Sequence, residues 1–239
     1  MQCMLGTPSH AKSYPFPVPG RSYLFRNGKV EDLGPDGFDR AGRTPVLAAG
    51  SNQSHEQLTR KYSVLEGHVE IPVQRGKLGG FDSVYAAHLA GYGSVPSTFY
   101  PSPKTQVTTY VLWLDDAQLN RMHETERNYT YDRLENIQVE IDGEEVLTTA
   151  YAYTAVVGCL NVNGAPAALS EISAEGRTFP AMTQTDILDF VRERLAPDRG
   201  LDEFIAQHIA DEKLRRARTS ALSADSIPAE FDRTVLRTY

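Results

Sequence analysis

A series of β-forming segments in the middle of the chain constrains the fold most strongly. The segments 68–73, 81–89, 105–114, 136–141 and 146–156 are rich in β-branched and aromatic residues, and turn-forming residues separate them. Asp142-Gly143 stands between the last two segments, and this dipeptide is typical of a tight β-hairpin. The pattern predicts five strands, of which the last two form a hairpin.

A strand, a tight loop and a helix are predicted just before this series. Residues 45–49 form a short apolar run that ends at Gly50. Ser54 and Gln57 have the spacing of a helix capping box, which predicts that a helix begins near His55. Apolar residues then recur on one side of the helical pattern, at Leu58, Tyr62 and Leu65.

Helical patterns also occur between the strands and after them. A helix over about 116–127 is predicted between segments 105–114 and 136–141, with an aspartate as its N-cap. From Thr183 onward, apolar residues fit two amphipathic helices. Residues 1–43 hold five of the fourteen prolines and show no period of 2 or 3.6.

These patterns predict an α+β protein in three parts. Residues 1–43 are expected to be an extended Pro/Gly-rich N-terminal arm, residues 44–182 an α+β domain, and residues 183–239 a helical C-terminal extension packed on that domain.

Length and charge limit the function classes. The chain has 239 residues, enough for one or two domains with a buried core. With 24 basic and 31 acidic side chains its formal net charge is −7, which gives no general electrostatic basis for binding nucleic acid.

The two cysteines and six histidines show neither the pattern of a disulfide framework nor the spacing of metal ligands. Without an apolar run long enough for a membrane span, the sequence favours a soluble cytoplasmic protein with no nucleic-acid or membrane partner.

Glu126 is the strongest candidate for a catalytic residue. On the helix predicted over about 116–127, Leu119 and Met122 define the apolar side, and Glu126 follows them by seven and four residues. It should therefore point inward, whereas Glu124 should face solvent. A carboxylate aimed at a core can work as a general acid/base near neutral pH, because desolvation raises its pKa. The alternative is a structural glutamate at a helix end that accepts hydrogen bonds from its neighbours.

The loop Gly50-Ser51-Asn52-Gln53 is a second candidate. It lies between a strand end and a helix start, where exposed N–H groups can bind a carboxylate or an oxyanion. Gly50 would let a ligand approach the backbone closely. The alternative is an ordinary turn between a strand and a helix.

The two candidates occur in an order that resembles a known family. The segment AGSNQSHEQL (49–58) is similar to the YGSN-x-x-x-x-Q/R-L signature of the gamma-glutamylcyclotransferase superfamily. Residues 91–141 resemble that family's second block, in which a proline-rich approach, a strand and a helix lead to a D/E-x-x-E motif and a further strand. The resemblance covers residues 45–160 and, more loosely, the helices to about 209.

The resemblance implies a mixed β-barrel flanked by helices and an enzyme that cyclises a small γ-glutamyl amide to 5-oxoproline, releasing an amine. Glu126 matches the family's catalytic general acid/base. Gly50, Ser51, Asn52 and Gln53 match its substrate-binding loop, and Tyr131 matches the aromatic residue after the glutamate. The reaction requires no cofactor and no metal.

Two residues depart from the family's pattern. Ala49 stands where the family has a tyrosine before Gly-Ser-Asn, and Arg127 stands where a glycine commonly follows the catalytic glutamate. These departures leave two alternatives open. One is a non-catalytic member of the same fold that binds a small acid, and the other is a related acyl-transfer or amide-hydrolysing enzyme.

Overall fold

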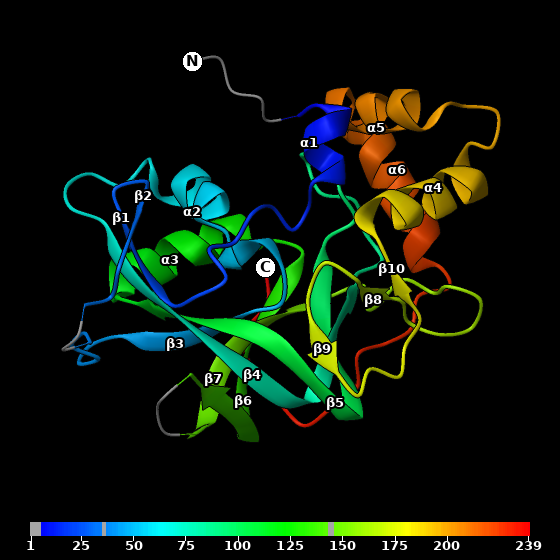
Figure 1. Ribbon diagram of the computed structural model, residues 1–239. Helices are drawn as coiled ribbons and strands as arrows, with labels where there is room; N and C mark the ends of the chain where they lie inside the picture. Colours follow the sequence, from blue (N-terminus) through cyan, green and yellow to red (C-terminus); the bar gives the residue numbers. More distant parts are fainter. Residues whose placement is uncertain (1–5, 35–36, 143–145) are drawn as a thin grey trace.

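Strand pairing closes five strands into a barrel in the computed structural model, which describes residues 6–34, 37–142 and 146–239. The five strands are β3 (Thr44–Ala48), β4 (Glu70–Tyr85), β5 (Ser97–Leu114), β6 (Tyr129–Ile141) and β7 (Val146–Ala155). Around the ring β3 pairs with β5, β5 with β4, β4 with β6, β6 with β7, and β7 with β3. Only the β3–β7 pair among these is parallel, so the protein is an α+β protein with a closed, mixed β-barrel (Figure 1).

Two strands are longer than the sequence predicts. β4 joins the predicted segments 68–73 and 81–89 into one strand, and its pairing with β5 is irregular at Phe81. β5 begins at Ser97 rather than near residue 105 and includes two prolines, Pro101 and Pro103. Phe81 pairs with both Pro101 and Gln106, so the prolines lie where the ladder is irregular and where proline is tolerated.

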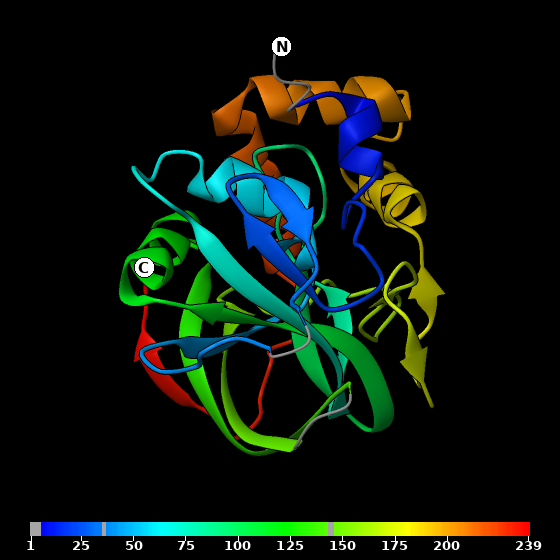
Figure 2. The same ribbon diagram turned by 60° about the vertical axis from the view of Figure 1, so that its left-hand side comes forward.

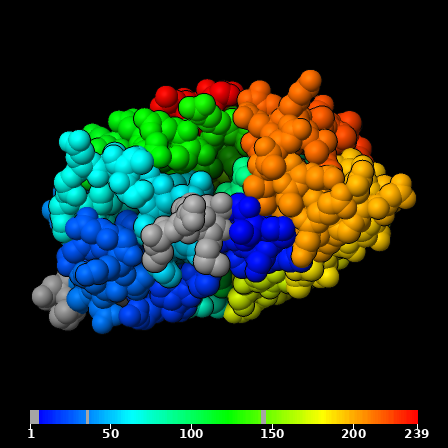
Figure 3. Space-filling view, turned by 90° about the horizontal axis from the view of Figure 1, so that it is seen from above, coloured from blue at the N-terminus to red at the C-terminus, as the bar shows by residue number. Residues whose placement is uncertain are grey.

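Helices cover the barrel in two groups. α2 (His55–Tyr62) and α3 (Asp116–Thr125) contact each other on one side, next to the short 3-10 helix η1 (Ser51–Gln53). The second group consists of α1 (Pro8–Lys12), α4 (Gln184–Leu195), α5 (Leu201–Ala210) and α6 (Glu212–Ser223). Figure 1 shows the two groups apart, and Figure 3 shows α1, in blue, against the orange helices of the second group. Among the described residues, no helix has the length and hydropathy needed to cross a membrane.

The N-terminal residues do not form the predicted extended arm. Residues 6–34 contain α1 and a hairpin of β1 (Tyr23–Arg26) and β2 (Lys29–Glu31), and β1 pairs with β4 of the barrel. The rings of Tyr23 and Phe25 are buried. The hairpin therefore belongs to the barrel domain, because its apolar side chains complete that domain's core.

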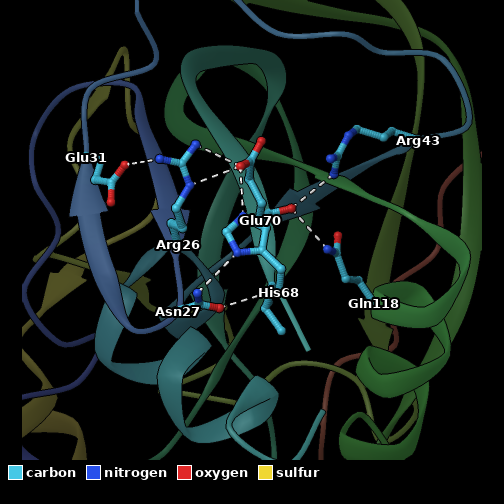
Figure 4. A network of polar contacts seen from close by, with 8 residues as sticks. Arg26, Asn27, Glu31, Arg43, His68, Glu70 and Gln118 are labelled. Atoms are coloured by element: carbon cyan, nitrogen blue, oxygen red, sulfur yellow. Dashed lines mark hydrogen bonds and ion pairs between the residues drawn. The ribbon is translucent and has the colours of Figure 1, made fainter. Parts of the chain in front are cut away.

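A polar network holds this hairpin on the barrel (Figure 4). Arg26 donates from Nε and Nη2 to Oε2 of Glu70, at 3.0 and 2.8 Å, and also pairs with Glu31. The backbone carbonyl of Glu70 accepts from Gln118 Nε2 at 3.0 Å and from Arg43 Nη1 at 3.2 Å. Since Gln118 lies on α3, the network connects the hairpin, the barrel and the helix that leads to Glu126.

The C-terminal extension contains the predicted helices and also a strand. Thr183 caps α4, as the change of pattern at that residue predicts. After α6 the chain returns to the barrel, where β11 (Thr234–Arg237) pairs antiparallel with β6; Figure 2 shows it in red beside the green strands. Three two-residue strands complete the sheet: β8 (Ala168–Leu169), β9 (Ala174–Glu175) and β10 (Ala181–Met182).

The starts of α2 and α3 differ in how they are capped. α2 begins at His55 as predicted, but Ser54 Oγ donates to the carbonyl of Pro17 at 2.8 Å and no capping box forms. α3 has a complete capping box between Asp115 and Gln118 and ends at Thr125, so that Glu126 is its C-cap. β6 and β7 pair antiparallel as the hairpin prediction requires, while Gly143 of the predicted turn lies outside the described residues.

Candidate functional site

A cavity of about 470 Å³ brings the two predicted site segments together. Gly50, Ser51 and Asn52 line it from the end of β3 and η1, and Glu126 lines it from the end of α3. Further lining residues come from the N-terminal segment, α2, the 88–97 segment and the start of β6. Segments far apart in the sequence therefore build one concave site.

The Glu126 carboxylate is held from one side. The residue is 8% exposed, and its Oε1 accepts a hydrogen bond from Asn52 Nδ2 at 3.0 Å. The same oxygen contacts Nζ of Lys61. No donor in the described part of the chain contacts Oε2, so this oxygen is the one left for a ligand in the cavity.

Lys61 is a site residue that the sequence analysis missed. It is 2% exposed, and its ammonium also contacts Sδ of Met122 at 3.1 Å. Burial lowers the pKa of Lys61, while the neighbouring Glu126 acts in the opposite direction. Helical phase could have identified it, because Lys61 follows Leu58 by three residues and so falls on the apolar side of α2.

Gly50 is closely packed against two hydroxyl groups. A Cβ atom at this position would lie 2.0 Å from Tyr14 Oη and 2.2 Å from Ser97 Oγ. Its φ is −161°, so the position does not require glycine for a positive φ. The expected close approach therefore exists, but Tyr14 and Ser97 of the protein itself make it.

Tyr14 is the second residue that the sequence analysis missed. Its hydroxyl hydrogen-bonds Ser97 Oγ at 2.9 Å and accepts from the Ser97 N–H at 2.9 Å. Burial raises the pKa of Tyr14. Ser97 Oγ in turn donates to the carbonyl of Ala49 at 2.7 Å, so Tyr14 and Ser97 support the start of the Gly50 loop. No periodic pattern in residues 1–43 singles Tyr14 out.

Gln53 and Tyr131, both predicted to bind substrate, are not among the residues that line the cavity. The carbonyl of Gln53 accepts from Tyr23 Oη at 2.7 Å. The ring of Tyr131 stacks on Tyr151, with 5.3 Å between centroids. Tyr129 lines the cavity instead, and its hydroxyl donates to the carbonyl of Ser97 at 3.1 Å. Tyr129 and Tyr131 are two residues apart on β6, so both side chains leave the strand on the same face. The sequence pattern therefore does not predict which of them lines the cavity.

Arg60 and His88 add one charged and one neutral group to the cavity wall. Arg60 Nε donates to Gln57 at 3.0 Å and its guanidinium lies over the Tyr92 ring, but no described carboxylate forms an ion pair with it. His88 is 2% exposed, and its Nδ1 lacks a hydrogen-bond partner in the described structure. Burial lowers the pKa of His88 to about 4, so its ring is neutral at pH 7.

Arg127 and Glu124 both lie away from the cavity. Arg127 is exposed, and its Nε donates to the carbonyl of Glu124 at 3.3 Å rather than approaching the Glu126 carboxylate. Glu124 is exposed, as helical phase predicts, and accepts from Arg121 at 2.6 Å. Across the described ranges, no group of three or more histidine, cysteine, aspartate or glutamate side chains is placed to hold a metal ion.

One solved structure is similar to part of the chain. No known family model and no curated protein matches the chain. The chain is similar to the solution structure of a protein from Arabidopsis thaliana, at 22% sequence identity and a TM-score of 0.37. The match covers 53% of this chain and 74% of the Arabidopsis protein.

Proposed function

We propose that this protein is a gamma-glutamylcyclotransferase-like enzyme that converts a small γ-glutamyl amide to 5-oxoproline and a free amine. We also assign its barrel to the fold of that superfamily. Glu126 is the general acid/base of the proposed reaction, and Gly50, Ser51 and Asn52 form the substrate loop. Neither a cofactor nor a metal takes part in the proposed chemistry.

One observation carries the proposal: the hydrogen bond from Asn52 to Glu126 across the cavity. The two residues are 74 positions apart in the chain and belong to the two segments that resemble the superfamily. The hydrogen bond supports a shared site because it joins the proposed general acid/base to the proposed substrate loop. Glu126 is buried, and both residues line the same cavity.

The proposed mechanism needs few groups. The α-amine of the γ-glutamyl unit attacks the side-chain carbonyl carbon, which closes a five-membered ring and breaks the bond to the departing nitrogen. The cavity has to hold the substrate folded, because ring closure is favourable once the reacting atoms are close. Oε2 of Glu126 accepts a proton from the α-ammonium and delivers it to the departing amine.

Arg60 suits the α-carboxylate of such a substrate. It is a cation on the cavity wall, and no described acidic side chain pairs with it. Ser51 offers a hydroxyl group on the same wall. A zwitterionic γ-glutamyl unit would thus find a carboxylate partner at Arg60 and an ammonium partner at Glu126.

The direct test is an assay for product. The purified protein is incubated with a panel of γ-glutamyl amino acids and γ-glutamyl amines, and 5-oxoproline is measured by mass spectrometry. We expect 5-oxoproline and the free amine in equal amounts from at least one member. If no member yields 5-oxoproline, the proposed reaction is wrong; release of glutamate instead would indicate amide hydrolysis.

A non-catalytic binding protein is the second candidate, and the Lys61 contact favours it. An ammonium on the Glu126 carboxylate stabilises the ionised form and so weakens it as a base. Titration calorimetry with 5-oxoproline and with each panel compound separates the two functions. Binding without turnover across the panel would support the binding protein.

A further inference from the structure

Lys61 and Glu126 form a buried ion pair in the wall of the cavity. We propose that Lys61 is a positioning residue, which keeps Glu126 ionised and turns its Oε2 toward the substrate. The assignment of a substrate rests on the proposed function, but the pairing itself can be measured without turnover.

Geometry shows why the pair orients the carboxylate. Lys61 on α2 and Asn52 in η1 both donate to Oε1, so this oxygen has two partners from the same side. Met122 Sδ accepts a second hydrogen of the ammonium at 3.1 Å. Lysine Nζ carries three donors, and each contact reduces its freedom to move. The carboxylate is thereby fixed with Oε1 anchored and Oε2 open.

Burial shows why the pair also sets the charge. Lys61 and Glu126 are 2% and 8% exposed, and either charge alone would be costly to hold there. An opposite charge in contact favours the ionised form of each partner. Without Lys61, the amide of Asn52 would be the remaining hydrogen-bond donor to Glu126 among the described residues, and the carboxylate would lose the charge that favours its ionised form.

Six phenols interact electrostatically with Glu126, and the same cavity wall also holds the cation Arg60 and the neutral ring of His88. Burial is the main cause that raises the pKa values of these six phenols, and electrostatic interaction with Glu126 raises them further, so they are uncharged near pH 7. The six are Tyr14, Tyr62, Tyr92, Tyr129, Tyr153 and Tyr239. Arg60 and Arg121 act on Lys61 but do not contact Glu126. Within the described structure, Lys61 is thus the cation in contact with Glu126.

The test compares Lys61→Met with Arg127→Gln in the full chain. Methionine keeps the length of the side chain without its charge, whereas Arg127 is a cation next to Glu126 in sequence that faces solvent. Carbon-13 NMR titration of labelled glutamate, assigned with Glu126→Gln, follows the Glu126 carboxylate. We expect the Glu126 carboxylate to take up its proton at a higher pH in Lys61→Met than in the parent, because the charge in contact with it is gone. The titration of Arg127→Gln should overlay that of the parent.

Activity gives an independent readout. The acidic limb of the kcat/KM profile should move to higher pH in Lys61→Met by the same amount as the NMR titration, and a purely structural loss would lower kcat/KM without moving that limb. Lys61→Gln retains a donor to Oε1 without the charge and should show the same rise in pKa, which keeps the test available if the methionine variant does not fold.

The outcomes separate this inference from the proposed function. An unchanged Glu126 pKa in Lys61→Met and Lys61→Gln would overturn the role of Lys61. Absence of 5-oxoproline with the parent protein, together with a raised Glu126 pKa in the variants, would overturn the proposed reaction and leave the ion pair as a device of a binding site.

Discussion

Glu126 and Glu124 lie two residues apart and face different surroundings, the first a cavity and the second solvent. Glu126→Gln should leave the fold intact and reduce turnover by at least about 100-fold, because the amide keeps the shape of the side chain but cannot accept a proton. Production of 5-oxoproline by the folded variant measures this effect.

Glu124→Gln is the matched control for Glu126→Gln. Its side chain pairs with Arg121 on the surface, where an ion pair contributes little to stability. Turnover should therefore stay close to that of the parent. An essential Glu124 and a dispensable Glu126 would contradict the assignment of the catalytic residue.

Gly50 offers a prediction about packing rather than chemistry. In Gly50→Ala the new methyl group would overlap Tyr14 Oη and Ser97 Oγ, and overpacking of this kind costs about 1 to 3 kcal/mol. We expect a lower melting temperature together with weaker ligand binding, because both hydroxyl groups also line the cavity. Thermal melts and ligand titrations on the same sample measure the two effects.

Removal of the two hydroxyl groups is the control for Gly50→Ala. In a Tyr14→Phe, Ser97→Ala background the same glycine substitution should cost less stability, because its two closest contacts are gone. An equal loss in both backgrounds would show that the Tyr14 and Ser97 hydroxyls are not what requires glycine at position 50.

Sequence reasoning at the residue scale works where a local period applies. Helical phase places Glu126 in the interior and Glu124 outside. Helical phase also places Lys61 on the apolar side of α2. A lysine is nevertheless rarely buried, so the pattern alone does not predict that Lys61 is in the interior. Tyr14 reaches the cavity from a segment without a period, 83 positions from its partner Ser97, and no local rule predicts such a contact.

The start of α3 provides a prediction at the scale of the element. Asp115 accepts from the Gln118 N–H at 2.8 Å, and Gln118 Oε1 accepts from the Asp115 N–H at 3.1 Å. Asp115→Ala removes the cap and should cost about 1 kcal/mol of the free energy of unfolding. Since Glu126 ends this helix, the variant should also lose activity at a lower temperature than the parent. Chemical denaturation and temperature-dependent assays measure both.

Asp116→Ala is the control for the capping prediction. Asp116 lies in the first turn of α3 without being its N-cap, so its carboxylate is placed to interact with the helix dipole but not to cap the helix. We expect a smaller loss of stability than in Asp115→Ala. Equal losses would mean that charge, rather than the capping box, stabilises the helix start.

The capping boxes and the long strands show how far element prediction extends. The Ser54 and Gln57 pair has the right spacing, yet Ser54 donates to Pro17, a residue brought near by the fold. β5 contains prolines that argue against a strand in any single segment, and only its irregular pairing with β4 makes them compatible. Local patterns thus predict where elements exist, whereas tertiary partners determine their ends and caps.

At the scale of the whole molecule, both ends of the chain return to the barrel. β1 pairs with β4 near one end of the described chain and β11 pairs with β6 near the other. The sequence analysis predicts an arm and a helical appendage at these places, because an edge strand cannot be recognised without its partner. The cavity also takes residues from outside the central barrel segment, since Tyr14 and Ile209 line it.

The stability of the whole fold should depend on pH in the acid range. Near pH 5, two buried histidines should make the largest contribution to this pH dependence. Burial lowers the pKa of His88 and of His208 from 6.5 to about 4. The unfolded chain therefore binds more protons between these values, so the free energy of unfolding is retained above about pH 6.5 and falls as the pH drops toward 4. For His88 alone, the free energy of unfolding at pH 4 should be lower than at pH 7 by up to about 3 kcal/mol.

His88→Met isolates one of the two contributions. Among the described residues, the buried Nδ1 of His88 has no hydrogen-bond partner that the variant would lose, so an apolar residue of similar size should remove the titration while keeping the packing. The free energy of unfolding, measured with urea between pH 4 and 8, should depend less steeply on pH in His88→Met than in the parent. If His88→Met loses stability in acid as steeply as the parent, His88 is not buried in its neutral form, and the neutral group assigned to the cavity wall is wrong.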